Sequence, residues 1–308
     1  MKIDFLIPAS LTDGFCGQVA FFRMSLDALG PPYSDARLVV VFGDPPTEEL
    51  PPHWRRHFDR IGVEWAYNPD QVSRENYARQ HWRRFEIFRP DCDLVVMCDA
   101  DVAQLRPMDG LARQLIDEAA IGGVIAHYHF SWPGREKIPE VDWPELSQKV
   151  LGTTSIDLPY RYTLLPPDSP PQAPFYINYG VLMAPPDVLS ALYQSEMQII
   201  DKVAQNVGRY WAPQISVALS CARVGLTCKS LPMRYNFPND PTADGLYPEE
   251  MQNIIFMHYL RERHFNRNKI FADSQAFDAF MTAELYGSNE IFRHHVTRLT
   301  GGTFPFPG

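Results

Sequence analysis

The sequence has few cysteines and no long apolar run. Its 308 residues include five cysteines, an odd number, scattered as Cys16, Cys92, Cys98, Cys221 and Cys228. Their spacing matches neither a disulfide framework nor a zinc site, which is typical of a protein in a reducing compartment. No stretch approaches the ~20 apolar residues that a membrane-spanning helix needs. We therefore expect a cytoplasmic protein without a transmembrane segment.

Positive charge is also scarce. The chain has 28 Lys and Arg against 37 Asp and Glu, a formal net charge of -9, and no long basic block. This balance argues against binding to nucleic acid or to an anionic membrane surface. Repeats and low-complexity tracts are absent, and a hydrophobic content of 45% is enough for a sizeable core. Any phosphate that the protein binds is therefore expected to be small and bridged by a metal ion.

The first half of the chain alternates strand-like and helix-like segments, the pattern of βαβ units around a parallel sheet. The amino-terminal run that contains Asp4 is too short for a signal peptide and is expected to be the first strand. Predicted strands cover 3–8, 37–43, 63–67, 93–98 and 122–128, and predicted helices cover 18–29, 73–88 and 111–119.

In the second half, a stretch without predicted helices or strands is followed by further predicted strands and helices. Prolines are frequent from Phe130 to about Ala173 and the periodicity fails, so we expect a long surface insertion there. Strands are then predicted at 175–183, 227–231 and 254–257, helices at 186–207, 213–224 and from about Asp273 onward, and a loose tail at 300–308.

Two aspartates mark the end of the predicted strand 93–98. The four apolar residues 94–97 predict a strand buried on both faces, and ligands of open α/β sheets bind outside the carboxyl ends of such strands. Asp99 and Asp101, two positions apart, would repel each other there unless a hard divalent cation joined them. Such a cation would take phosphate oxygens as further ligands. The alternative is that one Asp caps the next segment and the other is solvated.

Four features, taken in order and spacing over residues 1–265, resemble the GT-A class of nucleotide-sugar glycosyltransferases, and more narrowly the glycogenin and lipopolysaccharide galactosyltransferase family. They are the D-x-D-V signature Asp99-Ala100-Asp101-Val102 after its strand, the segment Ile177-Asn178-Tyr179-Gly180-Val181, Gln214 at a helix start, and His258 at a strand end. The resemblance implies an α/β fold with a Rossmann-like, mostly parallel central sheet and flanking helices. It also implies a metal-dependent hexosyltransferase that takes a sugar from a UDP-sugar donor, with retention of configuration.

The resemblance also assigns roles to residues. Asp99, Asp101 and His258 would bind Mn²⁺ or Mg²⁺, and an imidazole ligand favours Mn²⁺. The candidate catalytic residues are Gln214, which would steady positive charge on the sugar ring, and Asn178. The remaining contacts expected for the donor are Pro8, Ala9 and Ser10 through backbone groups, Arg83 in preference to Arg84, Ala100, Asn178, Gly180, and Arg261 and His264, with Arg263 as a third candidate.

Some positions depart from the family pattern. Tyr179 replaces a small residue and Pro213 replaces a carboxylate, which leaves the donor sugar open. His127 and His129 share a strand face, so they either bind metal or line the acceptor pocket. Aromatic residues of the insertion either stack on a sugar or pack beneath the loop: Phe130, Trp132, Trp143, Tyr160 and Tyr162.

From the resemblance we expect a catalytic domain over 1–270, with a nucleotide-binding half (1–128), an acceptor-side insertion (129–173) and a donor-sugar and metal half (174–270). Residues 271–308 would form a helical extension and tail. The acceptor, whether a glycan, a lipid-linked molecule or a small molecule, stays open, as does the choice between a monomer and a homodimer. Two other functions stay in view: a sugar-nucleotide-binding protein of the same fold without turnover, and a D-x-D phosphatase, which would need a Thr where this chain has Ala103.

Overall fold

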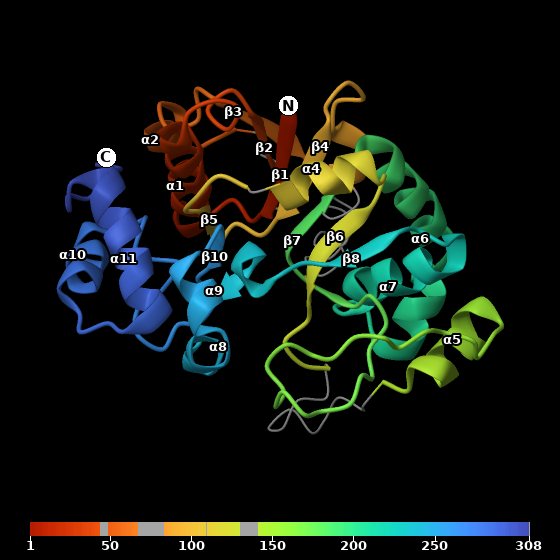
Figure 1. Cartoon of the computed structure of the whole chain (residues 1–308). Coiled ribbons are helices and arrows are strands. Elements are labelled where there is room, and N and C mark those ends of the chain that lie inside the picture. Colours follow the sequence, from red (N-terminus) through yellow and green to blue (C-terminus); the bar gives the residue numbers. More distant parts are fainter. Residues whose placement is uncertain (44–48, 67–82, 109, 130–140, 308) are drawn as a thin grey trace.

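A seven-stranded sheet forms the centre of the computed structural model, which describes residues 1–43, 49–66, 83–108, 110–129 and 141–307 (Figure 1). The strand order is β3-β2-β1-β4-β7-β6-β8. The bounds are β1 Ile3–Ala9, β2 Arg37–Phe42, β3 Ile61–Trp65, β4 Leu94–Cys98, β6 Ile121–Ile125, β7 Ile177–Ala184 and β8 Cys228–Ser230.

The sheet is mostly parallel, as expected. Strands β3, β2, β1 and β4 run parallel to one another, and β6 runs parallel to β8. Strand β7 lies antiparallel between β4 and β6. All five residues of β4 are buried, as the apolar run 94–97 predicted. The chain leaves the core at the carboxyl end of this strand, directly before Asp99.

Helices cover the sheet on both faces. Their bounds are α1 Asp13–Leu29, α2 Pro52–Arg55, α4 Gly110–Asp117, α5 Trp143–Leu151, α6 Pro186–Val207, α7 Ala212–Val224, α8 Pro241–Leu246, α9 Pro248–Gln252, α10 Ser274–Thr282 and α11 Gly287–Thr300, with a 3-10 helix at Met233–Tyr235. In Figure 1 α10 and α11 lie on the same side as α1, and α5, α6 and α7 lie on the opposite side. Most of the helix predicted at 73–88 falls outside the described residues; 83–87 are helical. No helix of the described residues is long and apolar enough to cross a membrane.

Helix α5 corrects the expectation that 130–173 is a loop throughout. Its first turn is capped by the side chain of Asp142, which accepts a hydrogen bond from the backbone N–H of Glu145, and it ends at Gly152 in the left-handed conformation. Pro144 lies in the first turn, where proline needs no hydrogen-bond partner. The frequent prolines therefore concealed a helix start.

A second, three-stranded sheet was not predicted. It consists of β5 Val102–Gln104, β10 Phe256–His258 and β9 Phe237–Pro238, in the order β5-β10-β9. Strands of two or three residues are too short to show a hydrophobic period, so this sheet depends on long-range pairing. Its strand β5 begins directly after Asp101 and thereby extends the chain beyond the main sheet.

Helix α1 packs closely against the segment that follows the small sheet. The ring of Phe21 stacks on that of Phe271 with centroids 4.1 Å apart. A Cβ at Gly14 would lie 2.4 Å from the backbone oxygen of Asn268, and one at Gly17 would lie 2.2 Å from that of Phe271. Both glycines are therefore needed for residues 268–271 to approach the helix.

Candidate metal centre and ligand cleft

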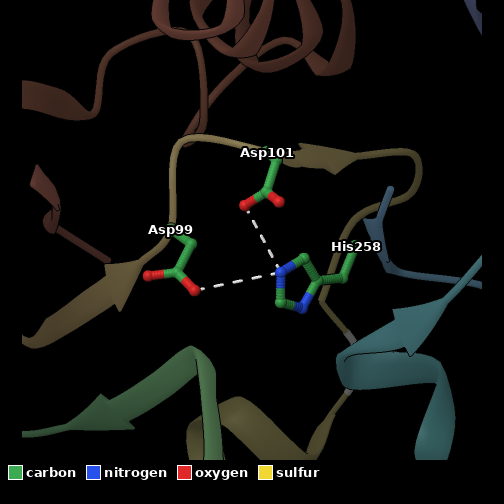
Figure 2. A group of neighbouring side chains, drawn as sticks. All are labelled: Asp99, Asp101 and His258. Atoms are coloured by element: carbon green, nitrogen blue, oxygen red, sulfur yellow. Dashed lines mark ion pairs between the residues drawn. The ribbon is translucent and has the colours of Figure 1, made fainter. Parts of the chain in front are cut away.

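Three potential metal ligands converge beyond the carboxyl end of β4. The Nε2 atom of His258 lies 3.3 Å from Oδ1 of Asp101 and 3.8 Å from Oδ2 of Asp99 (Figure 2). One ligand atom of each residue lies within 4.8 Å of the others, and among the described residues this is the group of His, Cys, Asp and Glu that can hold a metal ion. Two carboxylates and an imidazole are a donor set that Mn²⁺ accepts. The structure thus brings together the three predicted ligands.

Backbone pairing sets this geometry. Strands β5 and β10 are antiparallel, with His258 opposite Val102, and the N–H of Tyr259 donates to the carbonyl of Asp101 over 3.0 Å. The N–H of Asp99 donates to the carbonyl of Gly180 on β7 over 3.1 Å. The D-x-D segment is therefore held between the two sheets.

The two carboxylates differ in electrostatic environment. Desolvation in the cleft and the charge of Asp101 raise the pKa of Asp99 to about 6, against the attraction of His258, Arg84 and Arg267. Burial also acts to raise the pKa of Asp101, but attraction by His258 and by Arg267 outweighs it and lowers that pKa below the ordinary value. Repulsion between two adjacent carboxylates is the condition that a bound cation relieves.

A cleft of about 870 Å³ opens above the three ligands. Most of the residues expected to contact a donor line it. They are Pro8, Ala9, Ser10, Asp99, Ala100, Asp101, Asn178, Gln214, His258 and Arg261. Tyr179 and Pro213, the two departures from the family pattern, also line it. The end of β1, the start of α7 and the end of β10 thus face one space.

Three of the expected donor contacts lie elsewhere. Gly180 does not line the cleft; a Cβ on it would lie 2.3 Å from Nδ1 of His258, so its missing side chain makes room for that ring. His264 is exposed. Arg83 is ion-paired with Glu64 at 3.1 Å and with Glu86 at 3.0 Å, outside the cleft.

Arg84, like Arg83, does not line the cleft, but it contacts a residue that does. It is buried, and its guanidinium carbon lies 5.9 Å from the centre of the Tyr179 ring, a cation–π geometry. Its positive charge also acts to lower the pKa of Asp99. Adjacent helical residues point in different directions, so only one of the pair could serve the cleft, and the preference for Arg83 gains no support from this placement.

Two residues of the site were missed by sequence reasoning. Arg267 lines the cleft and is ion-paired with Asp101; it lies three residues after His264, the last of the residues predicted to contact the diphosphate. Asn236 accepts a hydrogen bond from Nδ1 of His258 over 3.0 Å, although no motif marks it. Arg267 was within reach of the sequence, because it belongs to the same charged stretch, whereas Asn236 was not.

Gln214 stands at the start of α7 with its amide held in one orientation. Its Nε2 donates to the backbone carbonyl of Ile177 over 2.6 Å. Because that carbonyl can only accept, the orientation of the amide is set, and Oε1 together with the second N–H of Nε2 is left for a ligand.

His127 and His129 both line the cleft. Nδ1 of His127 lies 3.0 Å from the Thr163 hydroxyl, which in turn donates to the carbonyl of Ile125. Desolvation lowers the pKa of His127 to about 3, so its ring is neutral at neutral pH.

The described aromatic residues of the insertion pack rather than face the cleft. Trp143 donates from its indole N–H to the hydroxyl of Tyr162 over 3.1 Å, and both rings are buried. Tyr160 bridges to Ala173 through the backbone. Phe130 and Trp132 lie outside the described residues.

Comparisons with known proteins bear on the fold. No protein-family model and no curated protein sequence matches the chain. Among solved structures, the galactosyltransferase LgtC, in complex with donor and acceptor sugar analogues, is similar with a TM-score of 0.51 and 15% identity, over 99% of this chain and 97% of that one. The bifunctional glycosyltransferase WbbM is similar with a TM-score of 0.56 and 10% identity, over 98% of this chain but only 50% of WbbM. Mouse xyloside xylosyltransferase 1 is similar with a TM-score of 0.50 and 11% identity, over 84% of this chain and 98% of the mouse protein. These similarities show that the chain has the GT-A fold.

Proposed function

We propose that this protein is a metal-dependent glycosyltransferase that moves a sugar from a UDP-sugar to a hydroxyl group of an acceptor, with retention of configuration and with Mn²⁺ as the preferred cation. The observation that carries the proposal is the convergence of Asp99, Asp101 and His258 at one cleft of a GT-A fold. The three solved structures named above are glycosyltransferases, which supports a transferase over other uses of the cleft. The catalytic unit would span residues 1–270.

Asp99, Asp101 and His258 would hold the cation at the end of β4, and the cation would supply positive charge against the negative charge that builds on the leaving diphosphate as the glycosidic bond breaks. Arg267 lies beside Asp101 and can bind phosphate oxygens with two parallel N–H groups. Arg267 is thus a further candidate for the role expected of Arg261 or His264. Arg261 also lines the cleft, where its Nε lies 3.0 Å from a carboxylate oxygen of Asp240.

Gln214 and Asn178 are the candidate residues at the sugar. Oε1 of Gln214 carries partial negative charge and can stabilise the positive charge that develops on the sugar ring. The Oδ1 atom of Asn178 already accepts from the backbone N–H of Gly180 over 2.9 Å, so Asn178 offers its N–H groups to oxygen atoms of the donor. Backbone groups of 8–10, at the end of β1, would hold the base and ribose.

The alternative functions differ in their predicted chemistry. A binding protein of the same fold would take up UDP and Mn²⁺ without turnover, and the departures at Pro213 and Tyr179 are what favours it. A D-x-D phosphatase would use Asp99 as a nucleophile, but Asp99 and Asp101 here share their space with His258, which favours a shared cation.

A two-part experiment tests the proposal. The melting temperature is measured with UDP, with and without Mn²⁺, since a ligand of the folded state raises it. UDP release is then measured over a panel of UDP-sugars with Mn²⁺. We expect a Mn²⁺-dependent shift that Asp101→Asn abolishes and that the exposed control Asp91→Asn retains. A full shift in Asp101→Asn would refute the metal site, and UDP binding without release from any donor would refute the transferase in favour of the binding protein.

A further inference from the structure

We propose that Asn236 is a positioning residue that holds the His258 ring in the one neutral tautomer able to bind the cation. Asn236 is fully buried and does not line the cleft, so it acts only through the groups that it contacts. It follows the 3-10 helix Met233–Tyr235, and its backbone N–H donates to the carbonyl of Met233 over 3.0 Å. The proposal rests on the metal site proposed above.

Backbone groups fix the orientation of the Asn178 amide first. The N–H of Gly180 can only donate, and it lies 2.9 Å from the side-chain oxygen of Asn178. Exchanging the oxygen and nitrogen of this amide would place two donors against each other, so the oxygen must face Gly180.

The orientation of the Asn236 amide follows. Its nitrogen lies 3.2 Å from the backbone carbonyl of Asn178 and 3.0 Å from the Asn178 side-chain oxygen. Both of these atoms are acceptors, so the group that faces them must be the NH₂ of Asn236. Its oxygen then faces His258.

The tautomer of His258 is thereby determined. Nδ1 of His258 lies 3.0 Å from the oxygen of Asn236, which can only accept, so Nδ1 carries a hydrogen. In the neutral ring this is the one N–H, and Nε2 therefore keeps its lone pair for a cation. A second hydrogen, on Nε2, is present only in the protonated ring, which is the form that attracts Asp99 and Asp101 when no cation is bound. Nε2 is the atom that points toward Asp99 and Asp101 (Figure 2). The other tautomer would direct an N–H at Asp101, and that hydrogen would have to leave before a cation could bind.

Close packing keeps the two side chains in place. A Cβ at residue 180 would lie 2.3 Å from Nδ1 of His258 and 2.8 Å from the side-chain oxygen of Asn236. A glycine is therefore required at this position of β7, where the strand passes the hydrogen bond between His258 and Asn236. His258 is 4% exposed, so little water reaches the ring to replace the partner. Outer groups that orient a metal-binding histidine in this way typically account for a 10–100-fold difference in metal affinity.

The experiment compares Asn236→Leu, Asn236→Asp and the control Asn289→Leu. Leucine removes the acceptor, whereas aspartate keeps an oxygen toward Nδ1 but loses the donor to Asn178. Asn289 is also buried, and its side chain pairs with that of Asn239, which contacts His258 only through the backbone and leaves the His258 ring untouched. Two quantities are measured: Mn²⁺ affinity by electron paramagnetic resonance, and the His258 tautomer in the metal-free protein at about pH 8 by nitrogen NMR, with His258→Gln assigning the signal.

We expect the Nδ1–H tautomer in the unsubstituted protein. Asn236→Leu should bind Mn²⁺ about 10–100-fold more weakly, while Asn236→Asp and Asn289→Leu stay within about threefold. Equal losses in the leucine and aspartate variants would show a merely structural role and overturn the proposal. An Nε2–H tautomer in the unsubstituted protein would overturn it too, even if Asn236→Leu fails to fold. Absence of Mn²⁺ binding with the Nδ1–H tautomer present would refute the proposed function instead.

Discussion

Gly180 illustrates how the site is built at the scale of single residues. The family pattern assigned it to the sugar pocket, but in the structure its hydrogen faces the ring of His258, and its backbone groups bond to Asp99 and Asn178. One glycine thus contacts two of the three proposed metal ligands, Asp99 through its backbone and His258 at its ring. The residue was recognised from its motif, and its role became clear only from tertiary contacts.

Replacing Gly180 with alanine should therefore damage the metal site more than the fold. The new methyl group must displace His258, which we expect to weaken Mn²⁺ binding at least tenfold and to lower the free energy of unfolding by about 1–3 kcal/mol, the range of overpacked cores. Calorimetric Mn²⁺ titration and urea unfolding measure the two effects. Gly245→Ala is the control, because a Cβ there has no atom within 4 Å. Unchanged Mn²⁺ affinity in Gly180→Ala would contradict the close packing.

Removing the charge of Arg267 should change the affinities for Mn²⁺ and for UDP in opposite directions. It is paired with Asp101, so it competes with a cation there, yet it can also bind the donor phosphates. Arg267→Met should therefore bind Mn²⁺ alone more tightly and, with Mn²⁺ saturating, bind UDP about 10–100-fold more weakly, the loss expected for a charged hydrogen bond. Titration with each ligand measures both. Arg263→Met removes an exposed charge of the same segment and should change neither; a loss of both affinities in Arg267→Met would contradict the double role.

At the scale of elements, the length of a segment decided what could be predicted. Helices α6 and α7 and strands β1 and β2 were located to within about two residues, because each carries several periods of its hydrophobic pattern. Strands β5 and β9 have three and two residues, and their existence depends on pairing with β10 far along the chain. Asp99 and Asp101 were predicted because they follow a buried strand, and His258 was predicted from the family resemblance. Asn236 and Arg267 do not follow an apolar run. Their place in the site is seen only from their contacts with His258 and Asp101.

The docking of α11 on α1 predicts a pH dependence of stability. His295 of α11 is buried, with one ring nitrogen 3.1 Å from the Ser25 hydroxyl, and burial followed by the charge of Arg298 lowers its pKa to about 3. An unfolded histidine titrates near 6.5, so between pH 6.5 and 3 the unfolded chain binds the extra proton. The contribution of His295 to stability is therefore complete above pH 6.5 and is lost as the pH falls toward 3.

This effect can be isolated by substitution. From pH 7 to about 5.5, His295 should account for about 1 kcal/mol of lost unfolding free energy. Urea unfolding of His295→Gln should show a pH dependence shallower by that amount, and that of the exposed neighbour His294→Gln should match the unsubstituted protein. Identical slopes in all three would mean that the His295 pKa is not lowered.

At the scale of the whole molecule, the cation would join the two sheets. Asp99 follows β4 of the main sheet, Asp101 precedes β5 of the small sheet, and His258 ends β10. A ligand that binds only when both sheets are folded and packed together stabilises both sheets against unfolding. Mn²⁺ at 100 times its dissociation constant should add about 2.7 kcal/mol to the free energy of unfolding.

Hydrogen exchange can show whether that stabilisation is global. Slow amides of β2 and of β10 should gain equal protection on addition of Mn²⁺, and a chelator should remove it from both. Protection confined to the small sheet would indicate that the sheets open separately and would contradict this view of the molecule.

The distance along the chain between the D-x-D segment and His258 also has a consequence for how the protein is made. Strand β10 is placed by pairing with β5, and it lies in the last quarter of the sequence. A chain still emerging from the ribosome can pair β1, β2 and β4 but has no β10 to set against β5. Uptake of the proposed metal ion would therefore mark the completion of the fold, and fragments that end before residue 258 lack one of its three candidate ligands.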